Sequence, residues 1–353
     1  MNCFAIARKR QAGFSLIELM MVLVILVTVS GIVATGLFRM TRTQGTVWNR
    51  TETHAAVRSA TELLQQEISQ AGRIALPPGP PVTLLGAVAG LGASATVSVS
   101  STAGMFPQMK LVIGPDAVSG CPGTQCGSQE TVTLTAVGAG TITAVFQDPH
   151  AIGAAVNVAG AFAAGLVPPC GPLPIPPCPG GAAAYKSLTV DIAGNPVVTT
   201  MTAATGSTGF ILKLFGDIND DGNLVYVEYK CDMSTNPGKF TRSVTPFTAG
   251  AKTVAQTLLT NLLANPAPPA DGRCFDYQTR PIQNNTYVIN VTVTLTIQTE
   301  YKDPQTNQFQ TETKALLNVS PRNVYEAWQL TGSPGGTLYR IQPMPFSVVS
   351  LLP

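Results

Sequence analysis

An acidic run at residues 217–228, DINDDGNLVYVE, has the residue types and spacing of a calcium-binding loop. It fits the pattern D-x-[DN]-x-[DN]-G-x5-E without a gap, and Ca²⁺ prefers such oxygen ligands. The expected ligands are Asp217, Asn219, Asp221, Asn223 and Glu228. The flanking runs FILKLF and LVYVEYK are typical of strands, so this is not an EF-hand. The alternative is a metal-free turn built from Asp, Asn and Gly.

The seven cysteines are the next residues that could do chemistry. Cys3 lies in the basic segment at the start of the chain, and an even set remains: Cys121, Cys126, Cys170, Cys178, Cys231 and Cys274. An even number of cysteines in an exported domain predicts disulfides. Proximity favours the pairs Cys121–Cys126 and Cys170–Cys178, which leaves Cys231–Cys274. A zinc site is the alternative, but the sequence has no C-x-x-C pair.

Motifs of enzymes are missing from the sequence. It contains no G-x-S-x-G, no P-loop and no H-E-x-x-H. Of the two histidines, His54 is expected to be a solvated helix residue and His150 a turn residue that hydrogen-bonds the backbone. We therefore expect a protein without enzymatic activity, and no cofactor other than Ca²⁺.

The composition points to a turn-rich protein with few charged residues and a net charge close to neutral. Only 11% of the residues are charged and the formal net charge is +2, whereas a soluble domain carries about 25% charged residues. Nucleic acid is not expected as a partner, because its recognition needs a basic face. The 33 glycines and 28 prolines favour β-structure with many turns.

The N-terminus combines a basic segment with a long apolar run. Residues 1–13 include Arg8, Lys9 and Arg10, and residues 14–38 carry one charge, Glu18. As a helix the apolar run is about 37 Å long, which exceeds a bilayer core of about 30 Å. The preceding positive charges predict that this end stays cytoplasmic while the body is exported. Since a carboxylate within the span costs roughly 2.5–3.5 kcal/mol, Glu18 is expected to have a partner.

The run GFSLIEL, from Gly13 to Leu19, resembles the prepilin leader junction of type IV pilins and pseudopilins. The resemblance implies that a prepilin peptidase cuts between Gly13 and Phe14 and methylates the Phe14 amine. It also implies that Glu18 aligns subunits in a filament and that the apolar helix packs against other pilins. The alternative is a plain signal anchor whose Glu18 reaches towards the membrane surface. Unlike many major pilins, this helix has no proline at its middle.

Residues 60–72, ATELLQQEISQAG, resemble the equivalent stretch of minor pilins of the PilW type. That resemblance implies a structural subunit that helps to assemble or cap a type IV pilus. It would span the inner membrane once, with its body in the periplasm, and later join the extracellular filament. The alternatives are a type II secretion pseudopilin, an adhesin-like binding head displayed on the pilus, and an envelope protein outside any filament.

The helix that carries this junction is expected to continue beyond the membrane. One apolar stripe follows helical spacing: Val57, Ala60, Leu64, Ile68 and Ala71. Charged residues, Glu67 among them, are expected on the other faces. Gly72 and the prolines at 77 and 78 then end the helix.

The rest of the chain is expected to be rich in strands. Short Val, Thr and Ile runs between Gly and Pro predict a β-rich insert at 83–160. The longest alternating run, 287–301, is expected to form a hairpin with 313–324, whereas the tail 329–353 is expected to be a loop or an edge strand. Helical spacing at 251–264, AKTVAQTLLTNLLA, predicts a short helix.

The expected fold class is α+β, with a long N-terminal transmembrane and stalk helix followed by a disulfide-stapled, mostly antiparallel β body. The expected segments are a cleaved leader at 1–13, the helix at 14–73, the β-rich insert at 83–160 and a pilin-like β body at 161–353.

Overall fold

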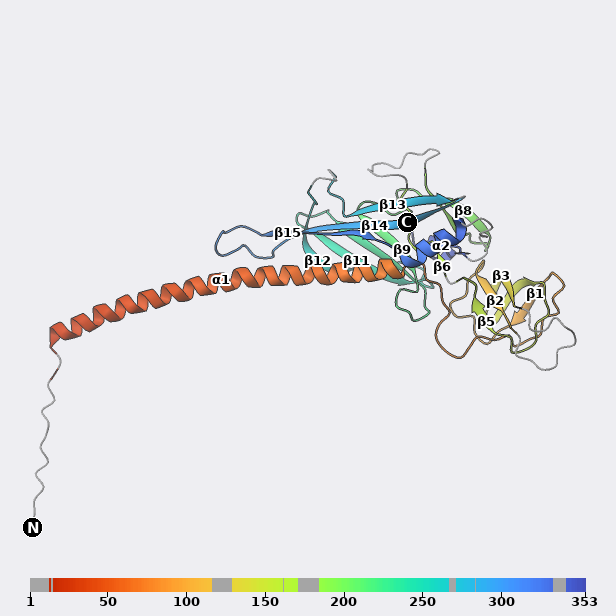
Figure 1. The fold of residues 1–353 in the computed structure, drawn as a ribbon, viewed down its shortest axis with the longest axis horizontal. Coiled ribbons are helices and arrows are strands. Elements are labelled where there is room, and N and C mark those ends of the chain that lie inside the picture. The colour runs from red at the N-terminus through yellow and green to blue at the C-terminus, as the bar shows by residue number, and fades with distance from the viewer. Residues whose placement is uncertain are drawn as a thin grey trace, which may run out of the picture. The chain divides into compact units, whose positions relative to one another are not determined.

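The computed structural model describes residues 13, 15–115, 129–160, 162–170, 184–266, 271–282, 284–332 and 341–353. The chain divides into two compact units, one of Met1–Glu52 with Thr299–Gln310 and one of Thr53–Gln298 with Thr311–Pro353. Helix α1 (Leu16–Gln70) contributes residues to both (Figure 1). The predicted long helix is therefore confirmed, and the leader lies outside the described residues apart from Gly13.

The larger unit contains a seven-stranded antiparallel sheet with the order β13-β14-β12-β11-β10-β9, and β15 pairs with β14. Its strands are β9 (Ile211–Gly216), β10 (Val225–Asp232), β11 (Gly238–Pro246), β12 (Gln256–Leu263), β13 (Phe275–Ile282), β14 (Asn285–Gln298) and β15 (Thr311–Val319). Strand β14 is 14 residues long, and alternating apolar residues such as Val291 and Val293 are buried. The predicted hairpin is confirmed, since Thr294 pairs with Ala315.

The C-terminal part of α1 packs on this sheet through the predicted apolar stripe. Val57, Leu64 and Ile68 are at most 1% exposed and belong to the same core cluster as sheet residues such as Leu214. After the helix, Gly72 has a φ of 82°, and a Cβ there would lie 2.6 Å from the carbonyl oxygen of Ala163. Only glycine fits this left-handed, close-packed turn.

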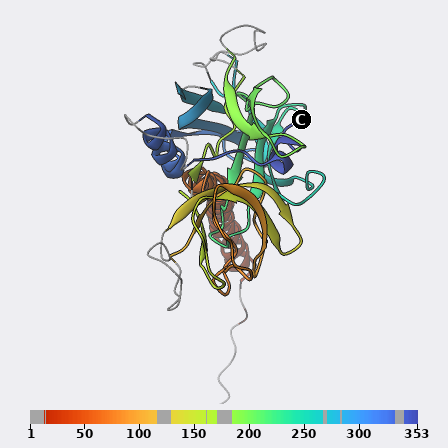
Figure 2. The ribbon, with the colours of Figure 1, turned by 90° about the vertical axis from the view of Figure 1, so that its right-hand side faces the viewer.

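A five-stranded antiparallel sheet with the order β1-β4-β3-β2-β5 forms the insert (Figure 2). Its strands are β1 (Ala93–Ser98), β2 (Lys110–Ile113), β3 (Glu130–Gly138), β4 (Thr141–Phe146) and β5 (Val156–Val158). The core below it also contains Phe215, Tyr226 and Met344 from later segments. The proposed boundaries of the insert at 83 and 160 stay a prediction, because this core is shared along the chain.

Short elements complete the larger unit. A two-stranded hairpin consists of β7 (Lys186–Val190) and β8 (Pro196–Thr200), and β6 (Phe162–Ala163) pairs in parallel with β16 (Ile341–Gln342). The helices are α2 (Arg322–Gly332) and α3 (Phe346–Val349). The tail is thus neither a loop nor a simple edge strand, since its start belongs to α2 and Ile341, Met344 and Leu352 are buried.

The prediction of a helix at 251–264 is wrong, because Gln256–Leu263 form strand β12. Leu259 and Leu262, three positions apart, are both buried. They face Phe240 and Gly238 of β11, so the two residues between the leucines lie opposite one residue of β11, and one of the two, Asn261, has a φ of 59°. This bulge turns both leucines to one face and produces a helix-like spacing within a strand.

Candidate functional site

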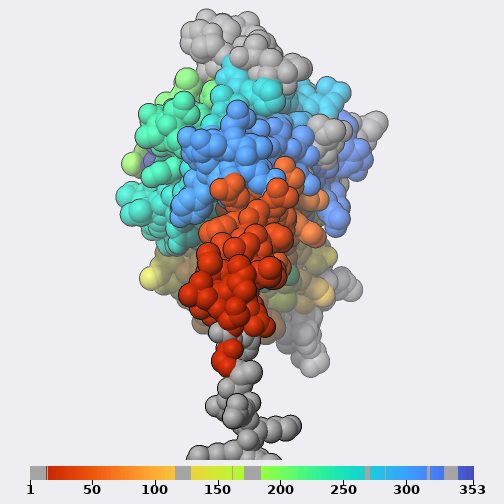
Figure 3. All heavy atoms as spheres, turned by 90° about the vertical axis from the view of Figure 1, so that its left-hand side faces the viewer, coloured from red at the N-terminus to blue at the C-terminus, as the bar shows by residue number. Residues whose placement is uncertain are grey.

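The N-terminal part of α1 is an apolar surface that the chain itself leaves open. Residues 16–44 are all exposed, including Leu16 at 77% and Phe38 at 68%. Figure 3 views this part of the helix, in red, from its N-terminal side. Among the described residues, α1 is the one helix long and apolar enough to cross a membrane. So large an exposed apolar surface is not stable in water, so we expect lipid or other helices to cover it.

The residues expected to be processed lie at the start of this surface. Glu18 falls in the first turn of α1, where a carboxylate stabilises the helix dipole. Gly13 is exposed and a Cβ there would meet nothing within 4 Å, so the backbone at the expected cleavage position is accessible. Phe14 and Cys3 lie outside the described residues.

A loop between β14 and β15 binds α1 just beyond its apolar part, within the smaller unit. Asp303 of this loop accepts a 2.6 Å hydrogen bond from the hydroxyl of Thr46. It also accepts bonds from the side chain of Gln310 and the backbone of Gln305. These hydrogen bonds, the one from Thr46 first, lower the pKa of Asp303 to about 2. No local pattern in the sequence predicts this contact, because its partners are 257 residues apart.

Glu67 binds the C-terminal end of α1 to the seven-stranded sheet. Its carboxylate is buried, contrary to the expectation that the charges of this helix lie on other faces. It accepts a 2.5 Å bond from the Tyr229 hydroxyl and forms an ion pair with Arg242. Burial raises the pKa of Tyr229 well above its ordinary value. Burial would lower the pKa of Arg242, but the hydrogen bond from its guanidinium to Glu67 keeps it raised.

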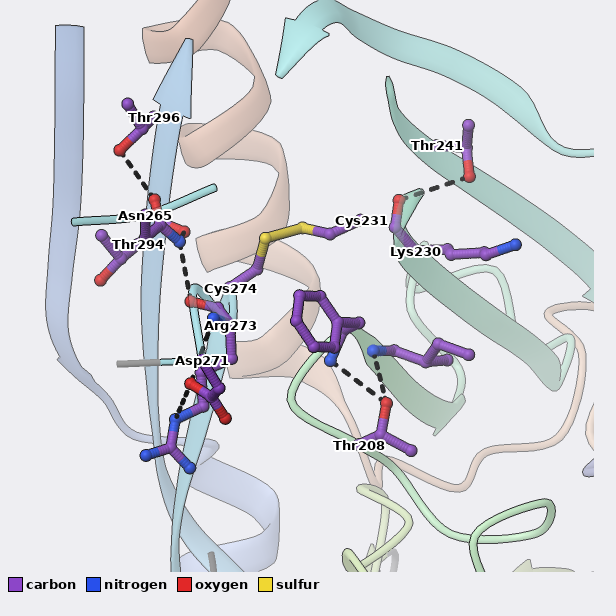
Figure 4. The surroundings of a disulfide bond; sticks show 12 residues. Thr208, Lys230, Cys231, Thr241, Asn265, Asp271, Arg273, Cys274, Thr294 and Thr296 are labelled. Carbon is purple, nitrogen blue, oxygen red and sulfur yellow. Dashed lines mark hydrogen bonds and ion pairs between the residues drawn. A yellow bond between two sulfur atoms is a disulfide. The ribbon is translucent and has the colours of Figure 1, made fainter. Parts of the chain in front are cut away.

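The structure joins Cys231 to Cys274, the pair that remained by elimination in the sequence (Figure 4). Both residues are 2% exposed, and their Cα atoms are 6.6 Å apart. Beside the bond, the amide of Asn265 donates to the carbonyls of Arg273 and Thr294. Cys170 is also disulfide-bonded. Its expected partner and the remaining expected pair lie outside the described residues: Cys178, Cys121 and Cys126.

The acidic loop is organised around Asp217 and Arg73. The buried Asp217 carboxylate accepts a bond from the backbone of Asp221 at 3.0 Å, and its second oxygen lies 3.7 Å from the guanidinium of Arg73. Arg73 also pairs with Asp220. Burial raises the pKa of Asp217, although backbone hydrogen bonds and the charge of Arg73 act in the opposite direction.

Glu228, the last expected calcium ligand, does not join this loop. It lies in β10 opposite Lys213, whereas Val225, at the start of the strand, lies opposite Gly216. At about 3.3 Å per residue, Glu228 is about 10 Å further along the strand than Val225. Its carboxylate accepts 2.8 Å bonds from Tyr226 and Lys252.

The other four expected ligands do lie on the loop: Asp217, Asn219, Asp221 and Asn223. Among the residues described, no group of three or more His, Cys, Asp or Glu side chains is placed to hold a metal. The calcium site and the metal-free turn both stay predictions, and the contacts of Arg73 and Glu228 favour the turn.

The two histidines both face carboxylates. His150 is 2% exposed, its ring nitrogen lies 2.9 Å from Glu130, and it exchanges two backbone hydrogen bonds with Val88. It hydrogen-bonds the backbone as expected, but it is a buried residue of a β-bridge and not a turn residue. The side chain of His54 is 62% exposed, as expected, and its Nδ1 atom lies 2.6 Å from the carboxylate of Glu312.

Comparison with known proteins identifies one short region. Residues 8–34 match the prokaryotic N-terminal methylation motif. No curated protein and no solved structure matches the chain. The motif and the apolar helix support a type IV pilin-like or pseudopilin-like subunit that is anchored in a membrane before assembly. They imply processing by prepilin peptidase and assembly with other pilins.

Proposed function

We propose that this chain is a minor pilin-like subunit of a type IV pilus, of the PilW type, that helps to assemble or cap the filament. The observation that carries the proposal is the open apolar surface of residues 16–44, which overlaps the methylation motif at residues 8–34. The size of the larger unit supports a minor role, because a bulky body packs poorly when repeated along a filament. In this proposal the body is periplasmic before assembly and extracellular afterwards.

The processing step sets the first experiment. We expect mass spectrometry to find a mature chain that begins with a methylated Phe14. Gly13→Leu should retain the leader and leave the chain in the inner membrane, because a large side chain replaces the small residue at the junction. A mature chain that begins at Met1, or one that is cut beyond Phe38, would contradict the proposal.

Glu18 is expected to pair with the Phe14 amine of its own or a neighbouring chain. We predict that Glu18→Ala inserts normally, since removing a charge from the apolar helix favours lipid, but enters sheared filaments at least about tenfold less. Glu62→Ala is the matched control, because Glu62 lies on the same helix in an exposed pair with Arg58. Quantitative mass spectrometry of filaments and membranes separates the two steps. Equal incorporation of both variants would remove the assembly role of Glu18.

Two other roles use the same anchor. A type II secretion pseudopilin would be absent from sheared pili and required for secretion, so the filament fraction distinguishes the two machines. An adhesin-like head is favoured by the separate five-stranded sheet of the insert. In that case Val145→Glu, which changes an exposed residue of β4 and leaves the shared core intact, should leave filament assembly unchanged but weaken binding to surfaces.

A further inference from the structure

The outer edge of β5, the last strand of the five-stranded sheet, is only partly paired. Asn157 pairs with Val112 of β2, so the backbone groups of the residues beside it, Val156 and Val158, point away from β2. The N–H of Val156 donates a 2.8 Å bond to the carbonyl of Val82. The edge is therefore closed at Val156 by the segment that precedes β1.

Pairing does not continue from Val82 towards residue 80, because the two residues that precede Val82 are prolines. Thr83 lies opposite Ala155, so the same register places Pro80 opposite Val158, and proline has no N–H to donate. Within the described part of the chain, no hydrogen bond reaches the outward N–H or C=O of Val158. The N–H and C=O of Val158 are therefore left open on this edge.

The proline-rich segment leaves a groove of about 380 Å³ beside these open groups. Leu76, Pro78 and Pro80 line one side and Val156 and Val158 the other, and no charged side chain lines it. An open N–H and C=O at strand spacing are matched by the main chain of an extended peptide. Uncharged walls disfavour a charged segment, whose desolvation would go uncompensated.

We propose that this groove binds an extended, uncharged peptide segment of another protein, which pairs with β5 at Val158. Backbone hydrogen bonds to Val158 supply the register, and the apolar walls select small or β-branched side chains. The inference goes beyond the role of the chain in a filament and does not depend on it, since it rests on the edge of β5 alone.

The first test selects a ligand from random sequences, so the partner itself need not be identified. A phage library of random linear peptides is panned on the full-length protein in detergent micelles, and enriched sequences are synthesised. We expect uncharged sequences rich in Val, Thr and Ile. Val158→Pro removes the outward N–H without touching a bond to β2, so it should weaken their binding about tenfold. Val158→Ala, which keeps the N–H, should bind within about threefold of the wild type.

The second test uses only the wild-type protein and holds even where Val158→Pro fails to fold. Each selected peptide is methylated at one backbone nitrogen at a time, and its affinity is measured by fluorescence anisotropy. Val156 is already paired with Val82, so one peptide N–H should bond to the carbonyl of Val158, and methylation should weaken binding at that one position. The proposal is overturned if no sequence is enriched, if the enriched sequences are charged, or if methylation is tolerated at every position.

Discussion

The carboxylate of Glu67 shows how one buried residue fixes a long helix to a sheet. It lies between Leu64 and Ile68, two members of the apolar stripe, and its charge is matched by Arg242 and by the hydroxyl of Tyr229. Sequence periodicity places an acidic residue on the solvent side by default. It cannot show that a partner 175 positions away makes burial of the charge possible.

We predict that Glu67→Gln destabilises the larger unit by about 3 kcal/mol, because the charge of Arg242 then stays buried without its partner. Glu62→Gln is the control on the same helix, and it should cost less than about 0.5 kcal/mol since its pair with Arg58 is exposed. Urea unfolding of the full chain in detergent, followed by near-ultraviolet circular dichroism, measures both. A double change of Glu67 and Arg242 to Met should recover part of the loss. Equal costs for Glu67→Gln and Glu62→Gln would show that the buried pair has no special role.

The acidic loop allows a second prediction at the residue scale. Arg73 already supplies a positive charge to Asp217 and Asp220, and Glu228 is bound elsewhere. We therefore expect calcium up to about 10 mM, above the usual range of weak extracellular sites, to leave the melting temperature of the wild type unchanged. Arg73→Gln should lower that temperature and make it rise with calcium. A rise in the wild type that a chelator reverses and Asp221→Ala abolishes would instead establish the calcium site.

Among the helices and strands, the sequence predicted correctly those whose structure depends on residues close together in the chain. The apolar run and stripe of α1, and the alternation of β14, are local, and both elements are where the sequence puts them. Strand β12 is different, because its bulge at Asn261 depends on pairing with β11. The spacing of its leucines fits a helix equally well, so only the partner strand distinguishes the two.

The loop at 299–310 provides a prediction that depends on pH. The pKa of Asp303 is lowered to about 2, whereas it is about 3.9 in an unfolded chain. Because the pKa is lowered in the folded chain, the ionised carboxylate of Asp303 stabilises the loop fully above about pH 4. This stabilisation is lost as the pH falls towards 2. We expect hydrogen-exchange protection of this loop, corrected for intrinsic rates, to fall over that range.

Asp303→Asn should lack this dependence and should show reduced protection at neutral pH. Glu300→Gln is the control in the same loop, since Glu300 is an exposed acid for which the structure shows no such set of donors. If Asp303→Asn keeps the protection of the wild type, the hydrogen bond to Thr46 does not hold the loop.

At the scale of the whole molecule, the C-terminal tail connects the two sheets of the larger unit, which the sequence did not reveal. Lys110 of β2 donates to the carbonyl of Ile341, and Lys213 of β9 donates to those of Ala204 and Leu352. Both are lysines bound to neutral backbone carbonyls. The tail contains almost no charge or periodicity, so its buried path depends on contacts with segments more than 100 residues earlier in the chain.

These two lysines predict an alkaline optimum of stability. Burial lowers the pKa of Lys110 and of Lys213 to about 8, against about 10.4 in an unfolded chain. Between these values the unfolded chain binds more protons than the folded one, so the free energy of unfolding should rise with pH. Above about pH 10 it should fall, because burial raises the pKa of Tyr226 and Tyr229 and only the unfolded chain then ionises them.

Urea unfolding at several values between about pH 7 and pH 11 should therefore show a rise of roughly 1–2 kcal/mol before the decline. Lys213→Met should remove about half of the rise, since it leaves only Lys110 to release its proton. Lys239→Met is the matched control, because Lys239 is exposed in β11, and it should keep the full rise. A stability that is flat or falls from about pH 8 upwards in the wild type would mean that water reaches both ammonium groups, and that the tail is not held by buried charges.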